Sequence, residues 1–141
     1  MLGDSIARAL PRLRAHAESR MTATFRAESP TRERVDGLME TVWASQGETP
    51  GRLSGPSRNS DVADRDITVG GIERLTFDAV LHLPLSAPLP VAGWEYECVA
   101  VSAVDDPAML GRRYRVVNAP VGSQKTARRV EVVDLSSGTI A

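Results

Sequence analysis

The sequence has 141 residues, of which 42% are hydrophobic, 25% charged and 4% aromatic, and its net charge is −1. This composition excludes a wholly disordered chain, and no apolar run reaches the roughly 18 residues of a membrane-spanning helix. The single cysteine, Cys98, excludes an internal disulfide and a cysteine-based metal cage. The length suits one domain over residues 1–141. Because the N-terminus lacks the apolar segment of a signal peptide, we expect a chain that is made and assembled in a reducing cytoplasm.

Charge is distributed unevenly along the chain. Residues 1–35 hold seven arginines and four acidic residues, residues 36–106 hold twelve acidic and four basic residues, and residues 107–130 hold six basic residues and no acidic one. Segregated charge produces faces of opposite sign, which steer association with partners or with copies of the same chain. A solvated surface with accidental charge blocks explains the pattern equally well.

Residues 4–22 are expected to form an amphipathic helix. Asp4 or Ser5 is a suitable N-cap, and Pro11 either kinks the helix or begins a second one that ends near residue 21. A single helix of this length is marginal in water, so its apolar stripe is expected to pack on another surface. The stripe recurs at spacings of three and four residues, at Ile6, Leu10, Leu13, Ala17 and Met21.

From residue 22 onward the pattern is typical of short strands. Residues 22–28 predict a strand that ends at Ser29-Pro30, and residues 38–45 predict a second strand with partial alternation. Residues 46–66 are rich in Gly, Pro, Ser and Asp, and they predict a long polar loop with room for a short strand at residues 51–54.

The second half of the chain contains the clearer strand patterns. Residues 66–69 predict a short strand before a Gly70-Gly71 turn, and residues 94–104, 113–118 and 128–135 predict three more strands. The strongest pattern is at residues 72–83, which end at a proline-rich connector. Apolar residues alternate there with polar ones, and the apolar positions are Leu75, Phe77, Ala79, Leu81 and Leu83.

One helix followed by six to eight short strands indicates a mostly β (α+β) fold. Eight-to-twelve-residue strand spacing favours a small β-barrel or sandwich, here formed by residues 22–135, with the N-terminal amphipathic helix attached and the long polar loop 46–66 projecting from one end.

The sequence does not indicate catalysis. His16 lies at the edge of the predicted helix and His82 on the polar side of a strand, so we expect both to be surface or structural residues; Cys98 has the apolar neighbours of a buried, unreactive thiol. A hydrolase or metal enzyme would need a site among a few loop carboxylates and one histidine, Asp61, Asp64, Asp66, Asp105 and His82. Solvated loop charge is the better interpretation, so we predict a protein that is not an enzyme and needs no cofactor or metal.

Six basic residues gather on the last two predicted strands and the segment between them: Arg112, Arg113, Arg115, Lys125, Arg128 and Arg129. Such a patch suits contact with phosphates. Single-strand binders, however, pair a basic groove with several aromatic side chains, and Tyr114 is alone here. Sequence-specific recognition is therefore not expected, while passive contact with DNA stays open.

One further pattern lies in the C-terminal part of the chain. Residues 106–116 read Asp-Pro-Ala-Met-Leu-Gly-Arg-Arg-Tyr-Arg-Val, and residues 123–129 read Ser-Gln-Lys-Thr-Ala-Arg-Arg and open the last strand. This arrangement resembles the small head–tail connector proteins of long-tailed actinobacterial phages, in which similar segments lead into the last two strands. The arginine-rich helix that ends near residues 18–22 and the strand at residues 73–83 are also similar.

The resemblance implies a head-closure, or stopper, subunit of the phage neck. Such proteins look like small β-barrels with added helices. They form a homo-oligomeric ring, six- or twelve-fold, below the portal and adaptor, retain the packaged double-stranded DNA and dock the tail terminator or tail tube. The resemblance therefore implies a virion protein that is assembled in the host cytoplasm and does not bind a membrane.

A ring of identical subunits needs two different complementary patches on each copy. The candidate contact residues are the basic ones of the helix and of the last two strands, Arg8, Arg12, Arg112, Arg113, Arg115, Lys125, Arg128 and Arg129. The candidate channel loop carries Asp61, Asp64 and Asp66, whose charge would repel DNA phosphates.

Two other functions stay open. A tail terminator or tail-completion subunit would share this scaffold but bind the tail tube. A free β-barrel that binds nucleic acid through residues 112–129 would show salt-sensitive affinity for DNA.

Overall fold

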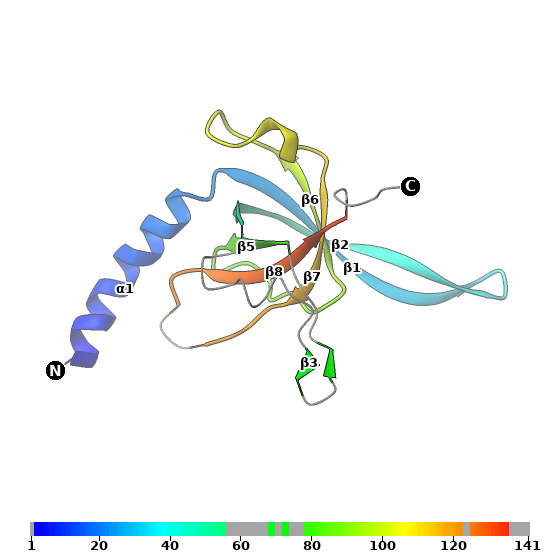
Figure 1. Cartoon of the computed structure of the whole chain (residues 1–141), viewed down its shortest axis with the longest axis horizontal. Coiled ribbons are helices and arrows are strands. Elements are labelled where there is room, and N and C mark those ends of the chain that lie inside the picture. Colours follow the sequence, from blue (N-terminus) through cyan, green and yellow to red (C-terminus); the bar gives the residue numbers. More distant parts are fainter. Residues whose placement is uncertain (1, 56–67, 70–71, 74–77, 123–124, 136–141) are drawn as a thin grey trace.

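The computed structural model describes residues 2–55, 68–69, 72–73, 78–122 and 125–135. Antiparallel strands close into a barrel in the order β1-β2-β5-β8-β7-β6, and one helix precedes them (Figure 1). This confirms the predicted mostly β fold with an N-terminal helix, and the closed order identifies a barrel rather than a sandwich. The helices are α1 (Leu2–Ser19) and the 3-10 helix η2 (Pro107–Met109). The barrel strands are β1 (Ala23–Val35), β2 (Leu38–Ser54), β5 (Ala79–Leu83), β6 (Glu95–Ala100), β7 (Arg113–Asn118) and β8 (Arg128–Asp134), and a separate hairpin pairs β3 (Thr68–Val69) with β4 (Ile72–Glu73).

The barrel is filled by alternate side chains of its strands, as the period of two in a strand requires. These inward residues include Phe25, Leu81, Leu83, Tyr96, Cys98, Tyr114, Val116, Val130 and Val132. Gly51 of β2 leaves room for this core, because a Cβ at residue 51 would lie 2.7 Å from Phe25 Cδ2 and 3.2 Å from Leu83 Cδ2. The Phe25 ring meets the Tyr114 ring edge to face, with centroids 6.3 Å apart, so it has no free space to move into.

Strands β1 and β2 continue past the barrel as a two-stranded arm, formed by residues 29–35 and 38–45 (Figure 1). Asp36 and Gly37 close its tip with positive φ angles of 51° and 82°, as a hairpin turn that matches the strand twist requires. The predicted strand end at Ser29-Pro30 is therefore wrong. Pro30 pairs with Trp43 in the arm, where half of the backbone N–H groups of each strand face solvent, so a residue without an N–H is tolerated.

Helix α1 runs through Pro11 without a break, so no second helix begins there. The predicted N-cap at Asp4 or Ser5 is wrong, because both residues lie inside a helix that begins at Leu2. The periodicity of side chains does not mark where a helix begins, and either residue would have capped a shorter one. Among the described residues, no helix is long and apolar enough to cross a membrane.

The polar loop predicted at residues 46–66 is wrong for residues 46–50, whereas the short strand predicted at residues 51–54 is confirmed. Residues 46–54 belong to β2, and Arg52–Ser54 pair with Val80–His82 of β5. Their composition misleads because the outward side chains are polar while Gly51 serves the core. The remainder of that prediction, including Asp61, Asp64 and Asp66, lies outside the described residues.

Two other predicted strands are shorter in the structure. The strand predicted at residues 72–83 divides into β4 and β5, and Asp78 forms a bend before β5; Leu75 and Phe77 lie outside the described residues. The strand predicted at residues 94–104 ends at Ala100, because the chain then turns around Asp105. That carboxylate accepts hydrogen bonds from the Ser102 N–H (2.8 Å) and from Thr22 Oγ1 (2.7 Å).

Candidate functional site

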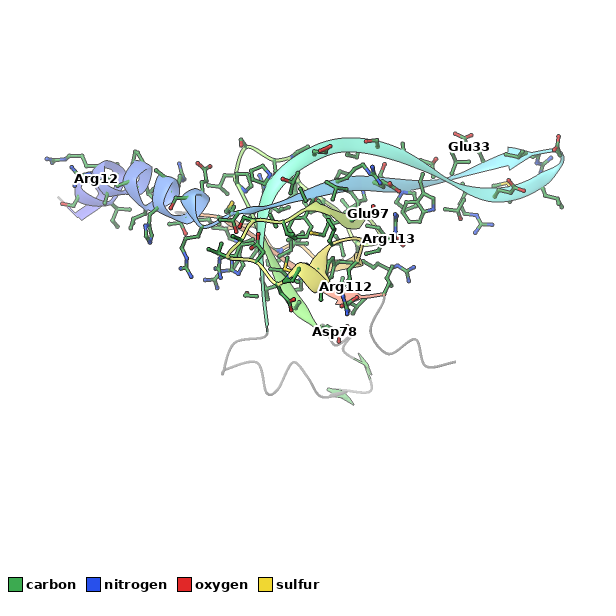
Figure 2. All side chains as sticks on the ribbon, turned by 90° about the horizontal axis from the view of Figure 1, so that it is seen from above. Arg12, Glu33, Asp78, Glu97, Arg112 and Arg113 are labelled. Carbon is green, nitrogen blue, oxygen red and sulfur yellow. The ribbon has the colours of Figure 1, made fainter. Side chains whose placement is uncertain are left out.

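Helix α1 and the arm project from opposite ends of the barrel. Arg12 on α1 and Glu33 on the arm mark these ends in Figure 2. Both projections expose large apolar side chains: Leu13 is 51% exposed on α1, and Leu38 and Met39 are 68% and 51% exposed on the arm. Clustered apolar exposure of this kind marks interaction surfaces, so these projections are the candidate functional site.

The pairing register divides the arm into two faces of different charge, because residues directly opposite each other share a face and successive residues alternate. The acidic face, as we call it, carries Thr31, Glu33, Val35, Leu38, Glu40 and Val42. The basic face carries Pro30, Arg32, Arg34, Met39, Thr41 and Trp43. On the acidic face Glu33 lies directly opposite Glu40, and no described residue forms an ion pair with either, so this face is suited to a cationic partner.

Helix α1 offers a basic surface at the other end. Arg8, Arg12 and Leu13 lie on one side of the helix, around a shallow hollow, and neither arginine forms an ion pair with a described residue. The C-terminal half of α1 contacts the barrel: Arg14 Nε donates to the Lys125 carbonyl (3.0 Å), and Met21, just beyond the helix, is 6% exposed. The prediction that the apolar stripe packs on another surface is thus confirmed at the C-terminal end of the stripe, whereas Leu13 stays exposed.

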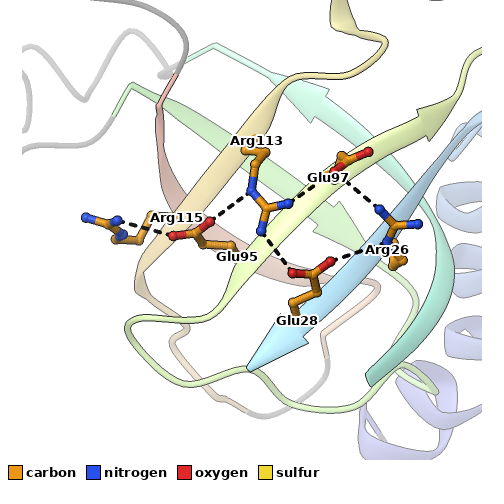
Figure 3. A network of polar contacts seen from close by, with 6 residues as sticks. All are labelled: Arg26, Glu28, Glu95, Glu97, Arg113 and Arg115. Carbon is orange, nitrogen blue, oxygen red and sulfur yellow. Dashed lines mark hydrogen bonds and ion pairs between the residues drawn. The ribbon is translucent and has the colours of Figure 1, made fainter. Parts of the chain in front are cut away.

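A network of ion pairs joins the root of the arm to the barrel (Figure 3). The register brings two charged rows together on the outer face of β1, β6 and β7, Glu28–Glu95–Arg115 and Arg26–Glu97–Arg113. Arg113 is central, because its three guanidinium nitrogens donate to Glu28 (3.0 Å), Glu95 (3.0 Å) and Glu97 (3.1 Å). Burial tends to lower the pKa of Arg113, but its hydrogen bonds to Glu28 and Glu95 and their negative charges outweigh this effect and raise that pKa above its ordinary value.

The ends of the network are held by two further arginines. Arg26 lies 3.4 Å from Glu28 and 3.3 Å from Glu97, and Arg115 lies 3.2 Å from Glu95. The Arg113 guanidinium also lies over the Trp43 ring of the arm, 5.9 Å from its centroid, within reach of a cation–π contact. Arg113 therefore links the three barrel strands to the base of the arm and fixes the direction in which the arm projects.

The structure does not gather the predicted basic residues into one patch. Arg113 and Arg115 belong to the network, and Arg112 pairs with Asp134 at 2.8 Å. Lys125 donates to the Pro120 carbonyl and Arg128 to the Leu85 carbonyl, at 2.7 and 2.9 Å. Neighbouring carboxylates neutralise the charges of Arg113 and Arg115 in β7. The role of the predicted basic residues as partner contacts stays a prediction.

Arg129 lies on a different outer face, where it stands opposite His82. His82 is 8% exposed, and its Nε2 lies 2.9 Å from Ser54 Oγ, so the expectation of a structural histidine with a satisfied ring is confirmed. Burial first, and then the charges of Arg52, Arg129 and Arg20, lower the pKa of His82 to about 4. The other histidine, His16, is exposed on α1.

The remaining titratable groups of the core are inert. Cys98 is fully buried, and burial raises the pKa of its thiol, which suits the unreactive cysteine that was predicted. Burial also raises the pKa values of Tyr96 and Tyr114 to about 12. Over the described ranges, no group of three or more His, Cys, Asp or Glu side chains is placed to hold a metal ion.

Sequence reasoning missed both the arm and the acidic half of the network. Glu95 and Glu97 alternate with buried residues in β6, as do Arg113 and Arg115 in β7, so each strand pattern indicates an outward charged row. Only the strand order brings the rows together, and the sequence does not reveal that order.

A profile of the family described as "Family of unknown function (DUF6093)" matches residues 13–133, so the chain belongs to this family. The matched range includes the arm, the barrel and the C-terminal part of α1. A comparison with curated proteins found no match.

Proposed function

We propose that this DUF6093 protein is a non-enzymatic structural subunit that assembles into a homo-oligomeric ring, the head-closure or stopper ring of a phage neck. The observation that carries the proposal is the pair of opposite projections, an arm with an acidic, apolar face and a helix with a basic, apolar surface. Two different complementary patches at opposite ends of one chain are what a heterologous interface needs, and such an interface closes into a ring when its rotation permits.

The contact between copies places the acidic face of the arm on α1 of the next subunit. Glu33 and Glu40 meet Arg8 and Arg12, and the apolar side chains Val35 and Leu38 cover Leu13. Charge complementarity then sets orientation and association rate, while apolar burial supplies most of the affinity. The Arg113 network supports this role because it holds the arm in one direction before assembly, which reduces the ordering cost of association.

The position in the neck rests on the resemblance of residues 106–116 and 123–129 to head–tail connector proteins. The ring would lie below the portal and adaptor on the head side and meet the tail terminator or tail tube on the other. Passive contact with packaged double-stranded DNA follows from that position.

The experiment that tests location is mass spectrometry of purified phage or virus-like particles from the source culture, in which this chain is quantified against the major capsid protein. A copy number equal to one ring per particle is the expected result. Absence from particles, with the chain free in the cell, overturns the neck assignment.

A charge-swap experiment tests the ring contact itself. The variants Glu33→Lys/Glu40→Lys and Arg8→Glu/Arg12→Glu are each expected to abolish oligomers in light-scattering measurements, because like charges then oppose each other. Mixing the two variants is expected to restore oligomers in which the two variants alternate, because the lysines of one arm meet the glutamates of the other helix and the remaining contact is unaltered. The matched control is Arg32→Glu/Arg34→Glu on the basic face of the same arm. Equal loss of oligomers in this control would refute the assigned face.

A further inference from the structure

We propose that the outer face of β2, β5 and β8, beneath the C-terminal end of α1, is a binding site for a phosphate-type oxyanion. This site lies apart from the arm. It shares Leu13 with the Arg8/Arg12 surface but none of the charged residues of the proposed ring contact, so it does not depend on the proposed role in ring assembly. Three observations support this site: two arginines in one row with a histidine, a cavity beside this row, and the lack of acidic partners for these arginines among the described residues.

The pairing register builds the row. Arg52 of β2 stands directly opposite His82 of β5, and His82 stands directly opposite Arg129 of β8. Three neighbouring strands thus present arginine, histidine and arginine side by side on one outer face. The two arginines are thus held one strand apart with a histidine, and no carboxylate, between them.

Two more basic side chains approach from the end of α1. His16 of the last helical turn and Arg20 just beyond it line a cavity of about 230 Å³ together with the row. The charge of Arg20 acts on both barrel residues, because it contributes to lowering the pKa of Arg52 and that of His82. The apolar part of the lining, which includes Leu13, Ala17 and Met21, limits the access of water and strengthens the electrostatic interactions inside.

The arginines of this site have no acidic partner within the described ranges. Arg20, Arg52 and Arg129 form no ion pair there, although seven such contacts join other described residues. Glu131, two residues further along β8 on the same face, instead accepts a hydrogen bond from Asn118 Nδ2 (3.0 Å). In the Arg113 network, by contrast, each guanidinium faces at least one carboxylate.

His82 does not add another charge to the site. Burial and the neighbouring arginines hold its pKa near 4, so its ring is uncharged at pH 7, and Ser54 Oγ at 2.9 Å holds the ring in place. Guanidinium groups bind tetrahedral oxyanions with paired hydrogen bonds, so two or three arginines suit a phosphate dianion. A cavity of about 230 Å³ accepts a phosphate or diphosphate group, which arrives either as a free ion or as part of a nucleic-acid backbone.

The test is titration of the full chain at pH 7 and constant ionic strength with three probes: inorganic phosphate and pyrophosphate by calorimetry, and a 20-base-pair duplex by fluorescence anisotropy. The test variants are Arg52→Gln and Arg129→Gln. The matched control is Arg32→Gln, an exposed arginine of the arm that lies outside the site. Circular dichroism of each variant checks folding, and the exposed Arg129 keeps the test usable should Arg52→Gln fail to fold.

We expect pyrophosphate to bind, each test variant to weaken it about tenfold or more, and the control to leave it unchanged. If the test variants also weaken the affinity for the duplex tenfold, and the control again leaves it unchanged, the DNA backbone is the source of the phosphate. A loss confined to the free ions would identify a small phosphorylated ligand. The proposal is overturned if none of the three probes binds, or if the control weakens binding as much as the test variants do.

Discussion

Arg113→Gln is expected to destabilise the fold more than any other single change in the network. The substitution removes three charge-assisted hydrogen bonds of 3.0 to 3.1 Å and leaves Glu28, Glu95 and Glu97 as neighbouring anions. The Glu95 side chain is only 6% exposed, so it keeps a single partner, Arg115 at 3.2 Å.

The magnitude follows from burial. Breaking a fully buried ion pair costs about 3 to 5 kcal/mol, and exposed pairs cost less than about 1 kcal/mol. The Arg113 side chain is 32% exposed and faces one buried and two half-buried carboxylates, so we expect a loss of about 2 to 4 kcal/mol. For a urea dependence of about 2 kcal/mol per molar, the unfolding midpoint falls by about 1 to 2 M.

The assay is urea unfolding followed by fluorescence in a Trp94→Phe background, in which Trp43 reports on the Arg113 contact at the root of the arm. The matched control is Arg115→Gln, which touches the same Glu95 but is 52% exposed, and we expect it to cost less than about 1 kcal/mol. The double variant Arg113→Gln/Glu95→Gln is expected to recover about 1 to 2 kcal/mol, since it removes the stranded carboxylate. Equal costs for Arg113→Gln and Arg115→Gln would refute the reasoning.

Three further predictions concern other parts of the chain. The lowered pKa of His82, about 4 against 6.5 in the unfolded chain, means that the unfolded chain binds more protons between these values. The free energy of unfolding therefore falls by about 3 kcal/mol as the pH falls through that window. Acid-unfolding curves of His82→Gln should lack this pH dependence, while those of a His16→Gln variant should keep it. Gly51→Val should lower the urea midpoint by the equivalent of about 1 to 3 kcal/mol, because its side chain meets Phe25 in a filled core, whereas Gly55→Val, with open space around it, should not. Pro11→Ala should increase amide-exchange protection in α1 about tenfold or more and leave the midpoint of the barrel unchanged, because the missing hydrogen bond is restored in a helix whose N-terminal half does not pack on the barrel; a shifted midpoint would contradict this.

The elements that sequence reasoning located correctly are those with a strong local signal. The boundaries of β7 were predicted at both ends, and β8 to within one residue, because apolar and charged residues alternate over residues 113–116 and 129–132. The helix, the burial of Cys98 and the structural part played by His82 followed from periodicity in the same way.

The errors share one physical cause. Residues 46–50 were taken for a loop because they are polar and include Gly47 and Pro50, yet they continue into the strand at residues 51–54, where Gly51 admits Phe25. The arm was missed because Pro30 normally ends a strand in a sheet, whereas a two-stranded ribbon tolerates it. In both cases a local propensity was overridden by a neighbour distant in the sequence.

The sequence by itself determined which residues face outward on each strand, because the period of two is a local property of the backbone. It did not determine which outward rows become neighbours. Barrel closure places Arg26, Glu97 and Arg113 in one row, where charges cancel, and Arg52, His82 and Arg129 in another, where they do not. Strand order and register arise from packing over the whole chain, and so only the tertiary structure decided which charged face is internally satisfied and which is left to meet a ligand.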